Sequence, residues 1–190
     1  MSARRAYGTA MVVLLVGSGI LLLAYAMTWA DAEVPILAGA EGSVQMREFT
    51  GGELYPGAAM SGWVGLAAVA GILATRSWGR VAVAVLTALA GLAGVAGATA
   101  FALMPSAAVD AAVSSLLGVD VDVPSSPTQA WILAVIGGLA VAIAGGWTAI
   151  RGRGWPSLGR RYERRPKEER AVSDWEAQDL GQDPTDDLVE

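Results

Sequence analysis

Four long stretches of the chain contain no Lys, Arg, Asp or Glu, and they constrain the fold more than any other feature. The hydrocarbon core of a bilayer is about 30 Å thick, so a helix needs roughly 20 uncharged residues to cross it. Backbone polar groups in lipid must bond within their own segment, which favours helices. The stretches are residues 6–30, 55–75, 81–104 and 130–150. They predict an all-α membrane protein, a four-transmembrane-helix bundle.

The composition agrees with a membrane protein and removes most catalytic chemistry. Hydrophobic residues make up 54% of the chain and charged residues 16%, and the charges are arranged in blocks. The absence of Cys and His excludes disulfides, thiolates, imidazole bases and the commonest zinc ligands. Asp120 and Asp122 stand two apart, but a calcium site needs roughly six to eight oxygens. We expect no enzyme activity, no cofactor, no metal site and no nucleic-acid partner.

The basic residues fall on one side of the predicted spans. Lys and Arg resist translocation, whereas acidic residues matter little. Only Arg47 among the thirteen basic residues lies on the outer side, which also carries eight acidic residues. The inner side holds Arg4, Arg5, Arg76, Arg80 and eight basic residues between positions 151 and 170. The partition predicts a multi-pass protein with both termini in the cytoplasm. Twelve of the thirteen basic residues are Arg, and Ala, Gly and Val dominate the chain, a bias typical of a GC-rich bacterial genome, so the membrane is expected to be the bacterial cytoplasmic membrane.

This topology divides the chain into two parts. Residues 1–150 form a transmembrane domain with outer loops at 31–54 and 105–129, and residues 151–190 form a cytoplasmic tail. Tryptophans are expected at the two membrane boundaries, where amphipathic rings prefer to lie. They are Trp29, Trp63 and Trp131 on the outer side and Trp78, Trp147 and Trp155 on the inner side.

A signal peptide is a competing interpretation of the N-terminus. Arg4 and Arg5 precede an apolar run that contains Ala24-Tyr25-Ala26, an A-x-A cleavage pattern. The h-region of a signal peptide is usually about 7 to 15 residues, much shorter than this run. We therefore favour a first span, while cleavage would leave three spans and an outer N-terminus.

Small residues recur every four positions in the spans and predict close helix packing, because lipid supplies no hydrophobic drive for helices to associate. The candidate packing residues are Gly94 in the third span and Gly138, Ala142 and Gly146 in the fourth. Two alternatives stay open. One ladder could instead form a homo-oligomer, or Ala and Gly could simply be frequent in a GC-rich genome.

The outer loops carry two local signals. The alternating segment Ser43–Phe49, followed by Gly51-Gly52, predicts a small β-hairpin in the first loop. In the second loop, Pro105 ends the third span and residues 106–117 predict a short amphipathic helix with Ser106 as its N-cap.

The tail changes from basic to acidic along its length. Its first half should lie on anionic lipid at the cytoplasmic face, since each basic residue there contributes about 1 kcal/mol. The candidate membrane-surface residues are Arg151, Arg153, Trp155, Arg160, Arg161 and Tyr162. In the acidic half, Ser173 and Glu176 form a capping-box pattern around Trp175. Trp175, Asp183, Pro184 and Thr185 are candidates for docking a cytoplasmic protein, and a disordered solubilising tail is the alternative.

Two tail motifs resemble a known family. The run W-P-S-L-G-R-R-Y from Trp155 and D-W-E-A-Q-D-L-G-Q-D-P-T from Asp174 are similar to the actinobacterial tryptophan-associated transmembrane proteins. The second motif departs from the family pattern W-x-A-L-D-x-G-x-D-P-T at Gln178-Asp179-Leu180. The resemblance implies a genomic association with tryptophan biosynthesis genes. It carries over no activity and no site residue.

Two functions follow as hypotheses. The first is a non-enzymatic scaffold or accessory protein whose tail docks a partner. The second is a small uncoupled transporter or exporter of tryptophan or an aromatic precursor. The spans lack the ionisable residues on which ion-coupled transport usually depends, so a coupled pump is disfavoured.

Overall fold

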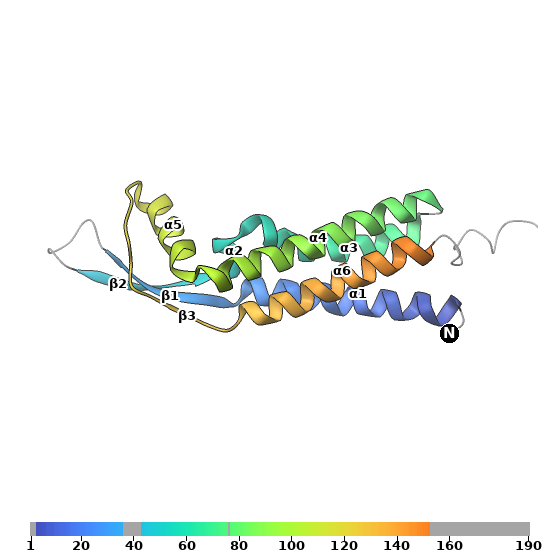
Figure 1. Ribbon diagram of the computed structural model, residues 1–190, viewed down its shortest axis with the longest axis horizontal. Coiled ribbons are helices and arrows are strands. Elements are labelled where there is room, and N and C mark those ends of the chain that lie inside the picture. Colours follow the sequence, from blue (N-terminus) through green and yellow to red (C-terminus); the bar gives the residue numbers. More distant parts are fainter. Residues whose placement is uncertain (1–2, 36–42, 76, 153–190) are drawn as a thin grey trace, which may run out of the picture. The chain divides into compact units, whose positions relative to one another are not determined.

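The computed structural model describes residues 3–35, 43–75 and 77–152. In these residues four helices are long and apolar enough to cross a membrane. They are α1 (Ala3–Ala26), α3 (Pro56–Ala74), α4 (Trp78–Leu103) and α6 (Trp131–Arg151). They lie side by side and alternate in direction along the chain (Figure 1). The predicted bundle of four long apolar helices is confirmed, with a small antiparallel sheet beside it.

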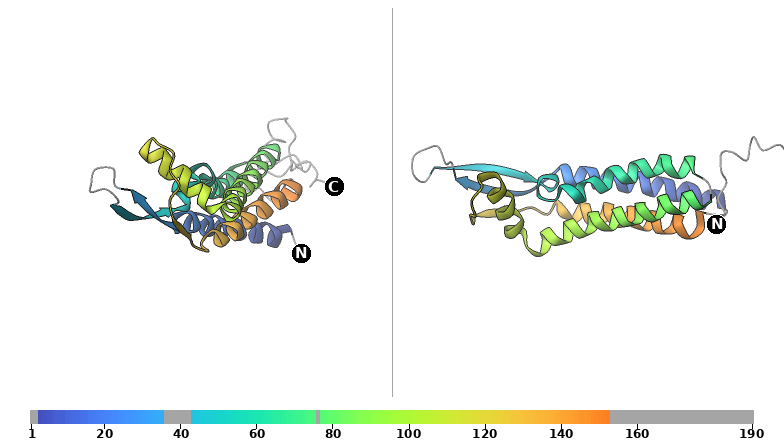
Figure 2. Two further views of the ribbon diagram at one scale, coloured as in Figure 1. Left: turned by 60° about the vertical axis from the view of Figure 1, so that its left-hand side comes forward. Right: turned by 90° about the horizontal axis from the view of Figure 1, so that it is seen from above.

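The bundle has two different ends. At the sheet end, where α1 finishes and α3 starts, three strands and the short helix α5 (Pro105–Leu117) extend beyond the spans (Figure 2). At the opposite end α3 finishes, α4 starts and α6 runs to Arg151; we call this the tail end. In the bundle, α6 packs against α1 and α4, and α3 packs against the same two helices.

The first span ends four residues earlier than predicted. Residues after Ala26 turn into the strand β1 (Thr28–Pro35), which pairs antiparallel with β2 (Val44–Thr50) and with β3 (Ser125–Pro127). The sheet order is β2-β1-β3. The hairpin in the first loop is confirmed, but Gly51-Gly52 does not form its turn. These glycines open the one-turn helix α2 (Gly51–Leu54), because Thr50 acts as its N-cap.

The second loop forms the predicted helix with a different start. Helix α5 begins at Pro105, whose fixed φ and missing N–H suit the first helical position, so Ser106 is inside the helix and is not its N-cap. Gly118 ends the helix in the left-handed conformation, with φ of 73°. Asp110 then accepts a 3.0 Å hydrogen bond from the Val123 N–H, which ties the following segment back to α5.

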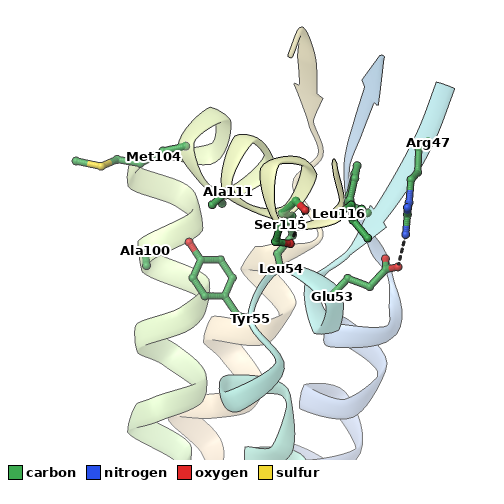
Figure 3. A pocket seen from close by; sticks show the side chains of 13 residues that line it. Arg47, Glu53, Leu54, Tyr55, Ala100, Met104, Ala111, Ser115 and Leu116 are labelled. Carbon is green, nitrogen blue, oxygen red and sulfur yellow. Dashed lines mark hydrogen bonds and ion pairs between the residues drawn. The ribbon is translucent and has the colours of Figure 1, made fainter. Parts of the chain in front are cut away.

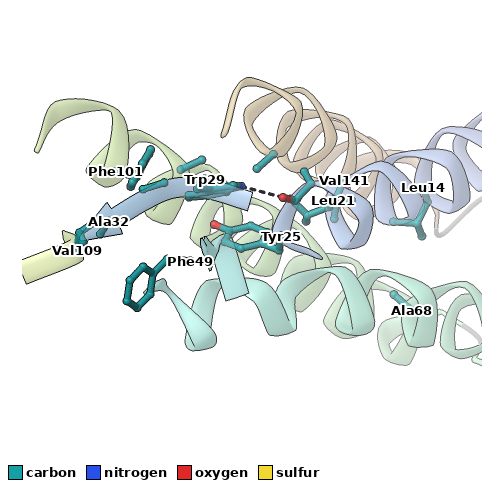
Figure 4. Packing of buried hydrophobic residues seen from close by; sticks show 14 of the residues in the cluster. Leu14, Leu21, Tyr25, Trp29, Ala32, Phe49, Ala68, Phe101, Val109 and Val141 are labelled. Carbon is teal, nitrogen blue, oxygen red and sulfur yellow. Dashed lines mark hydrogen bonds between the residues drawn. The ribbon is translucent and has the colours of Figure 1, made fainter. Parts of the chain in front are cut away.

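An aromatic core joins the bundle to the sheet. The Trp29 side chain is fully buried, and its Nε1 donates a 2.8 Å hydrogen bond to the Ala24 carbonyl (Figure 4). Its ring centroid lies 4.8 Å from that of Tyr25 and 5.1 Å from that of Phe101. Gly51 packs directly on the indole. Trp29 is therefore a core residue, and its assignment as a boundary anchor was wrong. Trp63, Trp78 and Trp147 are exposed.

Candidate functional site

A groove of about 640 Å³ opens at the sheet end (Figure 3). One wall is the small-residue face of α5, including Ala107, Ala111 and Ser115. The other comes from β2, α2 and the residue that precedes α3. The residues of that second wall are Arg47, Phe49, Glu53, Leu54 and Tyr55. The groove is therefore mostly apolar, with one charged pair among its lining residues.

The charged pair is positioned by the start of α2. Glu53 Oε2 accepts from the Thr50 N–H at 2.8 Å, and the Glu53 N–H donates to the Thr50 hydroxyl at 3.2 Å, which completes a capping box. The other carboxylate oxygen of Glu53 is 3.4 Å from Nη2 of Arg47. The Arg47 guanidinium also lies over the Phe49 ring, 5.0 Å from its centroid. Both charges are thus committed to contacts within the protein.

The same contacts set the ionisation of the groove. The main-chain N–H of Thr50 lowers the pKa of the Glu53 carboxyl and outweighs burial, which raises it. The Thr50 hydroxyl and Arg47 lower the pKa further. Burial raises the pKa of Tyr55. Neither shift produces a base or nucleophile poised for reaction near neutral pH. The arrangement suits contact with an apolar group better than it suits acid–base chemistry.

A buried arginine lies at the tail end. The Arg80 side chain is 2% exposed, and its guanidinium donates to the Gly152 carbonyl at 3.0 Å and to the Thr75 carbonyl at 3.2 Å. These carbonyls belong to the residues that end α6 and α3, where helices leave acceptors unsatisfied and carry partial negative charge. The Tyr7 ring of α1 lies 6.0 Å from the guanidinium carbon. One cation therefore connects elements from all four spans.

A comparison with protein families matches residues 11–185 to the tryptophan-associated transmembrane proteins. The chain belongs to this tryptophan-associated family. The match covers most of the sequence, so the predicted resemblance is confirmed and the protein is a multi-pass membrane protein with four candidate spans. No curated protein and no solved structure matches the chain.

Three of the candidate packing residues of this tryptophan-associated protein lie in helix contacts. A Cβ atom on Gly94 would lie 2.7 Å from the Ser61 hydroxyl of α3, and one on Gly138 would lie 2.9 Å from the Gly91 carbonyl of α4. The main-chain nitrogen of Ala142 lies 2.5 Å from a Cβ built on Gly91. Gly146 has open space around its Cβ position, and Gly145 occupies the contact with α4 instead.

Of the remaining predicted residues, only Arg151 lies within the part of the chain that the structure describes. Arg151 ends α6, with its guanidinium carbon 4.3 Å from the Trp147 ring centroid. The other candidates fall outside the described residues: Arg153, Trp155, Arg160, Arg161, Tyr162, Trp175, Asp183, Pro184 and Thr185. Sequence reasoning missed Arg80 as an individual residue because it counted it only as an inner-side charge. Its place next to an uncharged span was the available signal.

Proposed function

We propose that this protein is a non-enzymatic scaffold or accessory protein of the bacterial cytoplasmic membrane, linked to tryptophan metabolism, that holds a cytoplasmic partner. The observation that carries the proposal is backbone contact between helices. At Gly91, Gly137 and Gly145 a Cβ atom would lie between 2.5 and 2.7 Å from a main-chain nitrogen of the neighbouring helix. At these three contacts the helices leave no room for a solute to pass between α6 and either α1 or α4.

The polar groups of the bundle support the same role. The buried hydroxyls of Ser18, Thr87 and Thr148 donate at 2.7, 2.7 and 2.8 Å to carbonyls of their own helices, one turn back. Such bonds satisfy a hydroxyl without a ligand. A transported solute would need polar groups free to bind it along its path. These three hydroxyls instead belong to the packed interior.

The orientation belongs to the proposal. With twelve of the thirteen basic residues on one side, the tail end faces the cytoplasm and the sheet end faces outward. The Arg80 contacts then hold α3 and α6 together at the cytoplasmic surface, at the point where the chain enters its tail. The bundle would serve as a rigid base for the docking residues Trp175, Asp183, Pro184 and Thr185.

Crosslinking in cells tests the proposal. We expect the full chain to recover a specific cytoplasmic protein, and recovery to fall sharply in two separate variants, Trp175→Ala and a deletion of the final 17 residues, the segment from 174 to 190. Trp78→Ala is a matched control, because this tryptophan lies on the bundle and is exposed. Equal recovery by the wild type and both tail variants would count against the docking role.

A growth experiment tests the link to tryptophan. A deletion strain should show a defect without tryptophan that added tryptophan relieves. The Trp175→Ala variant and the tail-deletion variant should each fail to complement that defect. A defect that tryptophan leaves unchanged would separate the protein from this metabolism.

A further inference from the structure

A narrow apolar slot lies between α1 and α6 near the tail end. Its volume is about 260 Å³, and its lining is almost entirely apolar. Buried Ala6, Ala10 and Ala144 make a shallow floor because their side chains are small. Ile143 and Trp147 are exposed and line the α6 side. The Thr9 hydroxyl, also in the lining, donates to the Arg5 carbonyl at 3.0 Å and so needs no further partner.

The slot lies between two membrane-spanning helices, so it opens to the hydrocarbon core of the bilayer. Its residues fall within the candidate membrane helices Arg5–Ala26 and Trp131–Arg151. A void against apolar walls forfeits the dispersion contacts that a chain of methylene groups would make. The lining exposes almost no polar surface, so an ordered water would lack the two to four polar partners it needs. An acyl chain is therefore the occupant that the walls suit.

An arginine extends each wall by one helical turn toward the tail end. Arg5 precedes Thr9 by four residues on α1, and Arg151 follows Trp147 by four residues on α6, so each pair shares a helix face. Both arginine side chains are exposed, and within the described residues neither forms an ion pair with a carboxylate. The Trp147 ring supports the Arg151 guanidinium at 4.3 Å, which leaves the edge of the guanidinium available to donate.

We propose that this slot and the two arginines form a binding site for one anionic phospholipid, with an acyl chain in the slot and the headgroup phosphate on Arg5 and Arg151. Guanidinium groups suit phosphate oxygens because they donate two parallel hydrogen bonds. The apolar slot and the two exposed arginines are separate observations. A phospholipid accounts for both, because it carries an apolar acyl chain and an anionic headgroup in one molecule. The site does not depend on which side of the membrane the tail end faces.

The headgroup half is tested by native mass spectrometry of the full chain with phosphatidylglycerol and phosphatidylcholine. We expect the wild type to retain phosphatidylglycerol in preference to phosphatidylcholine. Arg5→Gln and Arg151→Gln should each weaken phosphatidylglycerol binding about fivefold, since one basic residue near anionic lipid contributes about 1 kcal/mol. Arg47→Gln, at the sheet end, is the matched control and should leave binding unchanged. The site would be overturned if the wild type retained both lipids equally. It would also be overturned if a variant with both Arg5→Gln and Arg151→Gln retained as much phosphatidylglycerol as the wild type.

The slot half is tested with variants that change only its shape. Thr9→Trp should fill the slot and reduce phosphatidylglycerol retention, whereas Val12→Trp, on an exposed position outside the slot, should not. Phosphatidylglycerol with brominated acyl chains should quench Trp147, so Trp147→Phe should remove more of the quenching than Trp78→Phe does. Equal effects of the paired variants would contradict an acyl chain in the slot.

A second copy of the chain is the competing occupant. The chain has no native Cys, so Thr9→Cys places a single thiol in the slot wall. We expect this variant to stay monomeric under mild oxidation when phosphatidylglycerol is present. A disulfide-linked dimer in high yield would assign the slot to helix association and overturn the lipid site.

Discussion

The guanidinium of Arg80 donates a 3.0 Å hydrogen bond to the main-chain carbonyl of Gly152, 72 residues away along the chain. Through this bond and the bond to Thr75, the first turn of α4 holds the last turns of α3 and α6. A buried charge at the end of a span is tolerated because both acceptors are helix-terminal carbonyls, which otherwise lack partners. Arg80 thus fixes the tail end of the bundle.

Replacing Arg80 should destabilise the bundle. Arg80→Gln removes charge-assisted hydrogen bonds to two carbonyls and should lower the free energy of unfolding in detergent by about 2–3 kcal/mol. Arg80→Lys keeps the charge but loses the two-pronged geometry, so it should fall between Gln and the wild type. Arg151→Gln, at an exposed position, should change stability by less than about 0.5 kcal/mol without added lipid. An Arg80→Gln variant with the same free energy of unfolding as the wild type would contradict the connecting role.

Two neighbouring glycines of α6 should respond in opposite ways to alanine. A Cβ on Gly145 would lie 2.6 Å from the Ala88 nitrogen and 2.9 Å from the Ala84 carbonyl, and backbone atoms of α4 cannot rotate away. Gly145→Ala should therefore destabilise the bundle by about 1–3 kcal/mol. Gly146→Ala meets open space and should be neutral or stabilising by up to about 1 kcal/mol, because alanine favours the helix. Chemical denaturation in detergent measures the free energy of unfolding of both variants. Equal changes in the two variants would contradict the contact between Gly145 and α4.

The capping box at the sheet end should make stability depend on pH. The folded pKa of Glu53 is lowered, chiefly by the Thr50 N–H, so its contribution is fully present above the ordinary value of 4.5 and is lost as pH falls through the folded value. The stability difference between the wild type and Glu53→Gln should therefore shrink in acid. Thr50→Ala keeps the main-chain N–H, the largest cause of the lowered pKa, and should retain most of this pH dependence, although losing the cap costs about 1 kcal/mol. A difference independent of pH would contradict the capping geometry.

The four spans could be predicted because bilayer thickness alone selects long uncharged segments. The end of the first span could not. Residues 28–30 are uncharged, but their pairing with Phe49, Thr50 and Pro127 depends on segments distant in sequence. The same pairing buries Trp29, which looks from sequence like an interfacial ring. Local hydropathy cannot distinguish a strand in a protein core from the last turn of a membrane helix.

The candidate sites show a similar division. The ladder of α6 was read with a period of four, whereas a helix repeats every 3.6 residues, so the contact face passes from Ala142 to Gly145 and away from Gly146. Arg47 was recognised only as an unusual outer charge. Its place in the groove depends on Glu53 and Phe49, which the hairpin and the capping box bring to it. Such three-dimensional neighbours leave no periodic signal in the sequence.

Cysteine labelling tests the orientation. Because the chain has no native Cys, Val119→Cys in the exposed segment after α5 gives a single thiol at the sheet end. A membrane-impermeant maleimide should label this variant on intact cells, since the sheet end is proposed to face outward. A Cys added after Glu190 should react only after the cells are opened. The reverse pattern would invert the topology.

Reconstitution into liposomes tests the central claim most directly, because a scaffold with backbone contact between its helices should pass no solute. We predict that uptake of labelled tryptophan, indole and anthranilate will equal that of empty liposomes, in vesicles shown to be sealed by retention of an entrapped dye. Saturable uptake of any of the three above the empty vesicles would contradict the account and establish a transporter.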